Sequence, residues 1–216
     1  MREFMLPSNS VDVARPDGSA PPRPAATVML LRDCDTACGV AVFMIRRART
    51  MVFAGGMAAF PGGASEVRDG DIIDAAIRET EEECGVRVAR ADLRPWARWL
   101  TPEFEPRRYD THFFMVETSA GSTPRAANSE AAAAFWICAR RALSDHDAGR
   151  LPMLPPTLVM LEDLAAAESV AEVLATPREV ALVVPWASRL PDGRAVLRVD
   201  LDGRGGGLPR SVVDPA

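Results

Sequence analysis

The sequence contains no lysine, so all 25 of its basic side chains are arginine. Chemistry that depends on a lysine amine, such as Schiff-base catalysis or phosphate binding by a P-loop, is therefore excluded. Histidine is also scarce, with two residues in the chain. A zinc site built from several imidazole ligands is consequently disfavoured.

Cysteine is represented by four residues, and Cys34 and Cys38 form the one close pair. A structural zinc site needs a second pair of ligands at matching spacing, which the sequence does not provide. We therefore expect reduced thiols in a cytoplasmic protein. The N-terminus lacks a basic start followed by a long apolar run, so neither a signal peptide nor a membrane span is expected.

The length and composition are typical of one globular domain. With 216 residues, of which 48% are hydrophobic, the chain can bury a sizeable core. The net charge of -5 provides no general field that would attract nucleic acid. We expect no nucleic-acid partner and no membrane partner, and the sequence leaves a homodimer open.

Proline and glycine mark the two ends of the chain. Residues 1–24 are proline-rich and predict a flexible leader, and residues 202–216 predict a flexible tail. Between them we expect a single domain, 25–201, that ends in a helical and hairpin extension. The patterns predict strands at 27–31, 39–45, 86–88, 96–100, 111–117 and 133–138, helices at 71–84, 139–147 and 157–175, and a last hairpin of 180–184 and 195–199. This order predicts an α/β or α+β domain with helices against a curved sheet.

The helix predicted at 71–84 carries acidic residues on one face. Successive residues lie about 100° apart around a helix, so Glu82 and Glu83 fall about 60° and 40° on either side of Glu79. Because like charges repel at this spacing, a positive group should hold the three carboxylates together. An all-oxygen cluster favours Mg²⁺ or Mn²⁺, which leave ligand positions for water and phosphates. The alternative is a solvated acidic face with no ligand.

The run from Arg78 to Val86, with Phe60-Pro61-Gly62-Gly63 before it, resembles the signature of the Nudix hydrolase family. The run matches the second half of that signature, which contains Arg-Glu, Glu-Glu and Gly at fixed spacing. The first half departs from it, because Asp69 replaces the expected glutamate and eight residues instead of seven separate it from Arg78. The role of Asp69 is left open.

The resemblance implies a Nudix fold, a curved mixed sheet sandwiched between helices, and Mg²⁺-dependent hydrolysis of a nucleoside diphosphate linked to another moiety. By position, the implied metal ligands are Glu79, Glu82, Glu83 and the Gly62 carbonyl. Glu79 and Glu82 would also act in catalysis, and Arg78 would orient the acids through a salt bridge. Glu130, six residues before Trp136, is the candidate for a further catalytic glutamate.

Two further stretches, 46–63 and 101–114, resemble the acyl-coenzyme A diphosphatase branch of the family. Their arginines would bind the phosphates of coenzyme A, because guanidinium groups match phosphate oxygens; these residues are Arg46, Arg47, Arg107 and Arg108. Pro102, sixteen residues past Val86, instead resembles the ADP-ribose hydrolases. A non-catalytic nucleotide-binding module of this fold and a hydrolase of modified nucleoside triphosphates stay open as alternatives.

Overall fold

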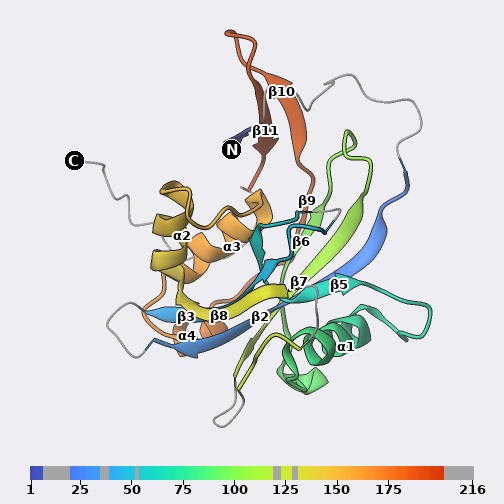
Figure 1. Ribbon diagram of the computed structural model, residues 1–216, viewed down its shortest axis with the longest axis vertical. Helices are drawn as coiled ribbons and strands as arrows, with labels where there is room; N and C mark the ends of the chain where they lie inside the picture. Colours follow the sequence, from blue (N-terminus) through green and yellow to red (C-terminus); the bar gives the residue numbers. More distant parts are fainter. Residues whose placement is uncertain (7–19, 35–38, 52–53, 119–122, 128–130, 202–216) are drawn as a thin grey trace.

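The computed structural model describes residues 1–6, 20–34, 39–51, 54–118, 123–127 and 131–201, which form two sheets with helices around them (Figure 1). The strands are β1 (Arg2–Met5), β2 (Arg23–Asp33), β3 (Val40–Arg47), β4 (Ala58–Ala59), β5 (Gly62–Ala64), β6 (Arg94–Leu100), β7 (Tyr109–Glu117), β8 (Ala131–Cys138), β9 (Leu182–Val183), β10 (Trp186–Arg189) and β11 (Ala195–Val199). The helices are α1 (Ile72–Cys84), α2 (Ala139–Asp147), α3 (Pro155–Ala165), α4 (Val170–Ala175) and the 3₁₀ turn η1 (Arg90–Asp92).

The larger sheet has the strand order β4-β3-β2-β7-β6-β9, with β5 paired to β2 and β8 paired to β3. Strands β2 and β3, which contain the predicted strands 27–31 and 39–45, are antiparallel. Strands β2 and β7 run parallel along the register from Arg23 opposite Tyr109 to Leu31 opposite Glu117. The mixture of directions confirms the predicted α+β fold.

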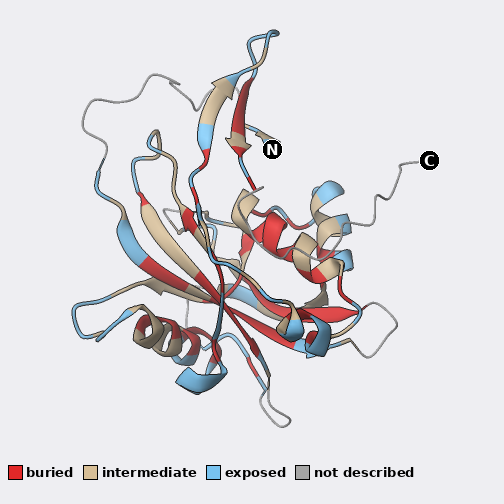
Figure 2. Cartoon of the chain, turned by 180° about the vertical axis from the view of Figure 1, so that it is seen from behind, coloured by how far each residue is buried: buried red, intermediate tan, exposed pale blue. Residues whose placement is uncertain are grey.

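Alternate residues of β2 enter different layers, because successive side chains of a strand point to opposite faces. Val28 and Leu30 face the cluster that includes Ala75 and Ala76 of α1. Met29 and Leu31 face the cluster that includes α3. Strand β2 is therefore buried on both sides, and Figure 2 shows the buried residues concentrated along the crossing strands and the inner sides of the helices.

The sequence predicted a flexible leader through residue 24, and part of that prediction is wrong. Arg2–Met5 forms β1, which pairs with β11 and places Phe4 opposite Leu197. Strand β2 also begins within the expected leader, at Arg23. A four-residue strand paired with the far end of the chain leaves no local periodicity to detect. Residues 7–19 and the expected tail, 202–216, lie outside the described residues.

Three other elements differ from their predictions. Residues 86–88 are not a strand, and the expected single helix at 157–175 is divided into α3 and α4. Ser169 is the N-cap of α4, and its side chain accepts a hydrogen bond from the Glu172 amide at 3.2 Å. The pattern of 157–175 was interpreted as one helix, so this cap was missed. The last hairpin is formed by β10 and β11, whereas Leu182–Val183 pairs with β6 in the other sheet.

The expectation that every cysteine is reduced is also wrong. Cys34 is disulfide-bonded, whereas Cys84 and Cys138 are free thiols. In the described part of the chain, no helix combines the length and the apolar character that crossing a bilayer requires.

Candidate functional site

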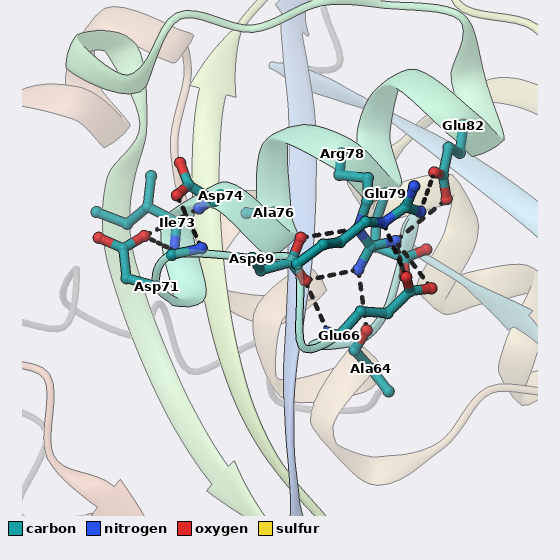
Figure 3. A network of polar contacts seen from close by, with 12 residues as sticks. Ala64, Glu66, Asp69, Asp71, Ile73, Asp74, Ala76, Arg78, Glu79 and Glu82 are labelled. Carbon is teal, nitrogen blue, oxygen red and sulfur yellow. Dashed lines mark hydrogen bonds and ion pairs between the residues drawn. The ribbon is translucent and has the colours of Figure 1, made fainter.

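Arg78 lies at the centre of the polar network shown in Figure 3. Its Nη1 donates to Glu79 Oε1 at 2.8 Å and to Glu82 Oε2 at 3.1 Å. Its Nη2 donates to the Ala64 carbonyl at 3.0 Å. One guanidinium therefore joins the acidic face of α1 to the strand β5 before it, and it is a positive group of the kind that the clustered carboxylates require.

Asp69 is the residue whose role the sequence left open, and it pairs with Arg78 through two hydrogen bonds. Arg78 Nε donates to Asp69 Oδ1 at 2.9 Å, and Nη2 donates to Oδ2 at 3.0 Å. The carboxylate side chain is 4% exposed, and the Glu66 amide also donates to it. Hydrogen bonding from Arg78 lowers the pKa of Asp69 from 3.8 to about 2. Despite the inserted residue and the shorter side chain, Asp69 thus holds the arginine of the acidic helix in place.

The two glycines at the start of β5, Gly62 and Gly63, bring the backbone close to the other carboxylates. The Gly62 amide donates to Glu83 Oε2 at 2.8 Å. A Cβ on Gly62, where φ is +153°, would lie 2.3 Å from the Ala26 carbonyl oxygen. A Cβ on Gly63 would lie 2.5 Å from Glu79 Oε1. Side chains larger than hydrogen would therefore displace either the strand or the acid.

Helix α1 is built so that its acids are presented at a fixed position. Asp71 begins the helix by accepting hydrogen bonds from the Ile73 and Asp74 amides at 2.9 and 3.0 Å. Gly85 ends it in the left-handed conformation, with φ of 67°. Both boundaries confirm the helix predicted from the sequence, and Glu83, although charged, is 3% exposed.

The acids form the polar end of a cavity of about 550 Å³. Its lining includes Glu79, Glu82 and Glu83 together with Gly62 and Gly63, so the predicted helix face and the predicted turn meet at one site. The donor set consists of carboxylate and backbone oxygens, which suits a hard cation such as Mg²⁺ or Mn²⁺. Within the described ranges, no three acidic, histidine or cysteine side chains are already gathered closely enough to hold a metal ion. For a cation to bind, the contacts of Arg78 with Glu79 and Glu82 would have to rearrange.

The four arginines predicted to bind phosphate lie in different surroundings. Arg47 lines the cavity, whereas Arg46 donates to the Arg150 carbonyl at 2.9 Å. Arg108 is buried and donates to the Thr101 and Ala20 carbonyls. Arg107 is exposed and is not part of the lining. The predicted Glu130 lies outside the described residues.

Three charged residues of the lining, Arg23, Glu66 and Glu105, were missed in the sequence. Arg23 stands in the segment interpreted as a leader, and Glu105 lies in the loop between β6 and β7. Burial raises the pKa of the Glu105 carboxyl. The sequence signal for Glu105 was the Thr-Pro-Glu stretch at 101–103 just before it. That stretch was interpreted only as a resemblance to one branch of the family.

Comparison with known proteins places this site in a family context. The family model described as NUDIX domain matches residues 21–156. No curated protein matches the chain significantly.

Several solved structures have the same fold. A NUDIX hydrolase from Alicyclobacillus acidocaldarius is 28% identical with a TM-score of 0.65, and the match covers 74% of this chain and 98% of that one. A MutT NUDIX hydrolase from Burkholderia pseudomallei is 20% identical with a TM-score of 0.51, covering 66% and 98%. The NUDIX domain of Shewanella oneidensis NrtR, complexed with ADP ribose, is 13% identical with a TM-score of 0.53, covering 66% and 86%. The last two resemblances concern the fold alone.

Proposed function

Because this chain belongs to the Nudix family and is a hydrolase of phosphorus-containing anhydrides, we propose that it cuts the diphosphate bond of a nucleoside diphosphate linked to another moiety. Family members generally use divalent metals, and Mg²⁺ or Mn²⁺ is the proposed cofactor here. The substrate is a small molecule, which is consistent with a cavity of about 550 Å³.

The observation that carries the proposal is the convergence of acidic side chains at one end of that cavity. Glu79 and Glu82 both contact Nη1 of Arg78, at 2.8 and 3.1 Å, so their carboxylates already flank one positive atom. Glu83 is held nearby by the Gly62 amide. Arg78 offsets part of the repulsion among these carboxylates, and carboxylate oxygens that line a cavity are the ligands that a hard cation prefers.

The proposed ligands are Glu79, Glu82, Glu83 and the Gly62 carbonyl. When bound, Mg²⁺ neutralises the charge of the diphosphate and acts as a Lewis acid. Arg78 keeps the acidic side chains in place and compensates part of their charge. Glu79, whose carboxylate lies against Gly63, accepts the proton of the attacking water. Glu130 is the other candidate for this proton transfer.

The proposed substrate class includes coenzyme A and acyl-coenzyme A. Arg47, which lines the cavity, supports the binding of further phosphates, and Arg23 lies on the same lining. The other three predicted arginines are not part of that lining; they are Arg46, Arg107 and Arg108. Their side chains would have to move to contact a phosphate in the cavity. The competing substrates are ADP-ribose and dinucleotides. The proposed location is the cytoplasm, and a homodimer remains open.

A substrate panel tests the function. Coenzyme A, acyl-coenzyme A, ADP-ribose, NADH and diadenosine polyphosphates are incubated with Mg²⁺, with Mn²⁺ and with excess chelator, and the products are identified by mass spectrometry. We expect metal-dependent release of adenosine 3′,5′-bisphosphate and a phosphopantetheine from the coenzyme A substrates, or of AMP from the others, and loss of turnover in chelator. Release of inorganic diphosphate from an added nucleoside triphosphate would instead indicate a hydrolase of nucleoside triphosphates. Binding without turnover of any compound would indicate the non-catalytic module.

A further inference from the structure

The cavity extends beyond the residues that the family shares. The family domain covers residues 21–156, yet Leu6, Pro185 and Leu197 also line the cavity. These three belong to the sheet formed by β1, β10 and β11 or to the segments next to it. Figure 1 places this sheet at the end of the molecule opposite α1. The two ends of the chain therefore supply a wall that the catalytic chemistry does not need.

This wall, here called the terminal wall, consists of Leu6, Pro185 and Leu197 together with Leu154, Pro155 and Pro156 at the start of α3. All six side chains are apolar. Three of the six are prolines, which have no backbone N–H to donate. Leu197 is 6% exposed, so it is fixed in the sheet and not a mobile surface group.

Such a wall discriminates strongly between chemical groups. A sugar placed against it would lose hydrogen bonds to water and gain few in return, which is unfavourable. An aliphatic chain would gain roughly fourfold in affinity for each CH₂ group that it buries. The charged residues of the lining, among them Arg23, Arg47 and Glu105, come from the family domain. Leu154, Pro155 and Pro156 lie at the C-terminal end of that domain, so the terminal wall joins them to the segments outside it.

From these observations we infer that the terminal wall is a specificity subsite for an aliphatic chain on the moiety linked to the diphosphate. The inference rests on the proposed hydrolysis, because it assigns one half of the same substrate. It places the diphosphate at the acidic face of α1 and the aliphatic chain against β1, β11 and the start of α3. A segment from each end of the chain thereby selects what the central domain cleaves.

The test uses ADP esterified on its terminal phosphate with methanol, butanol or octanol. Binding is measured by calorimetry with Ca²⁺ in place of Mg²⁺, so that the charge of the diphosphate stays neutralised while turnover is suppressed. We expect the octyl ester to bind at least about thirtyfold more tightly than the methyl ester, since several CH₂ groups are buried. Equal dissociation constants for the three esters would overturn the inference.

A matched pair of variants locates the effect. Leu6 lines the cavity, whereas its neighbour Met5 is 56% exposed and does not. Leu6→Ser should reduce the ratio of octyl to methyl affinity by at least threefold, and Met5→Ser should leave it unchanged. An octyl preference that Leu6→Ser does not alter would refute the terminal wall as its cause. If the preference holds but no ester is hydrolysed when Mg²⁺ is restored, the subsite is supported and the proposed reaction fails.

Discussion

Arg78 shows how one residue can serve both folding and chemistry. Its guanidinium donates to Asp69, Glu79, Glu82 and the Ala64 carbonyl, and its side chain is 12% exposed. Half of these contacts fix the loop before α1, and the others hold acids that line the cavity. In the proposed metal site, Arg78 and the metal ion would therefore compete for Glu79 and Glu82.

Glu82 offers a direct test of the acidic face. Its side chain is 45% exposed, so Glu82→Gln should leave the melting temperature nearly unchanged. If the carboxylate acts in the transition state, kcat should fall by at least about a hundredfold. The control is Glu81→Gln, since Glu81 lies on the same helix, is similarly exposed and pairs with Arg87. Near-normal kcat in Glu82→Gln would refute the assigned role.

Asp69 should contribute stability that depends on pH. Its pKa is about 2 in the folded protein, below the ordinary value of 3.8, because Arg78 favours the charged form. This contribution is complete above pH 3.8 and is lost as the pH falls through 2. Asp69→Asn should therefore lower the free energy of unfolding by about 1–3 kcal/mol near neutral pH. Urea unfolding at several pH values measures the difference, which should shrink towards pH 2. A difference that does not vary with pH would contradict this account.

Glu105 should have the opposite pH dependence. Burial raises the pKa of its carboxyl, so the folded state disfavours the charged form and loses stability as the pH rises through that pKa. Glu105→Gln should raise the melting temperature by about 1–2 °C at pH 7.5, and the gain should shrink at pH 4. Glu103→Gln, an exposed neighbour in the same loop, should give no such gain. Equal effects of the two variants would show that burial is not the cause.

At the scale of the element, α1 is the piece that the sequence predicts best. Its cap, its apolar face and its terminal glycine all lie within fifteen consecutive residues, 71–85, so local pattern and final structure agree. The turn of 60–63 was linked to this helix through the family resemblance, and Phe60, Gly62 and Gly63 line the same cavity as its acids. Position alone could not show that the Gly62 amide donates to Glu83.

The N-cap of α1 should contribute to the stability of the helix that carries the acids. Asp71→Ala removes two hydrogen bonds to the first turn and should lower the melting temperature. Asp71 also pairs with Arg90 at the surface, so Asp71→Ser separates the two contributions because it keeps a capping oxygen. Since surface ion pairs contribute little, the serine variant should recover most of the melting temperature. Equal losses in the two variants would assign the effect to the ion pair.

Elements that depend on distant partners could not be predicted. Strand β1 exists because Arg2–Met5 pairs with Val196–Val199 at the other end of the chain. Short strands such as β9, with two residues, carry no period of their own. The 86–88 segment has the apolar side chains of a strand, but Val86 and Val88 instead contribute to the cluster that covers α1.

At the scale of the molecule, the sandwich positions a polar and an apolar surface around one cavity. The parallel pair β2 and β7 separates the layer of α1 from the layer of α3. The acids come from the first layer, and Leu154, Pro155 and Pro156 come from the start of the second. The order of elements predicted helices against a curved sheet, and the family resemblance implied that helices lie on both of its faces. The lining by Arg23 and Leu6 was not predictable, because the proline-rich segment between them indicated a leader with no structural role.

Titration of the protein with Mn²⁺, followed by electron paramagnetic resonance of the free ion, tests the central claim most directly. The wild-type chain should bind at least one Mn²⁺, and Glu79→Gln, Glu82→Gln and Glu83→Gln should each weaken binding by about tenfold or more, since each removes one charged ligand. Glu81→Gln should bind as the wild type does. No Mn²⁺ binding by the folded wild-type protein, or equal binding by all of the variants, would contradict a metal site on the acidic face of α1.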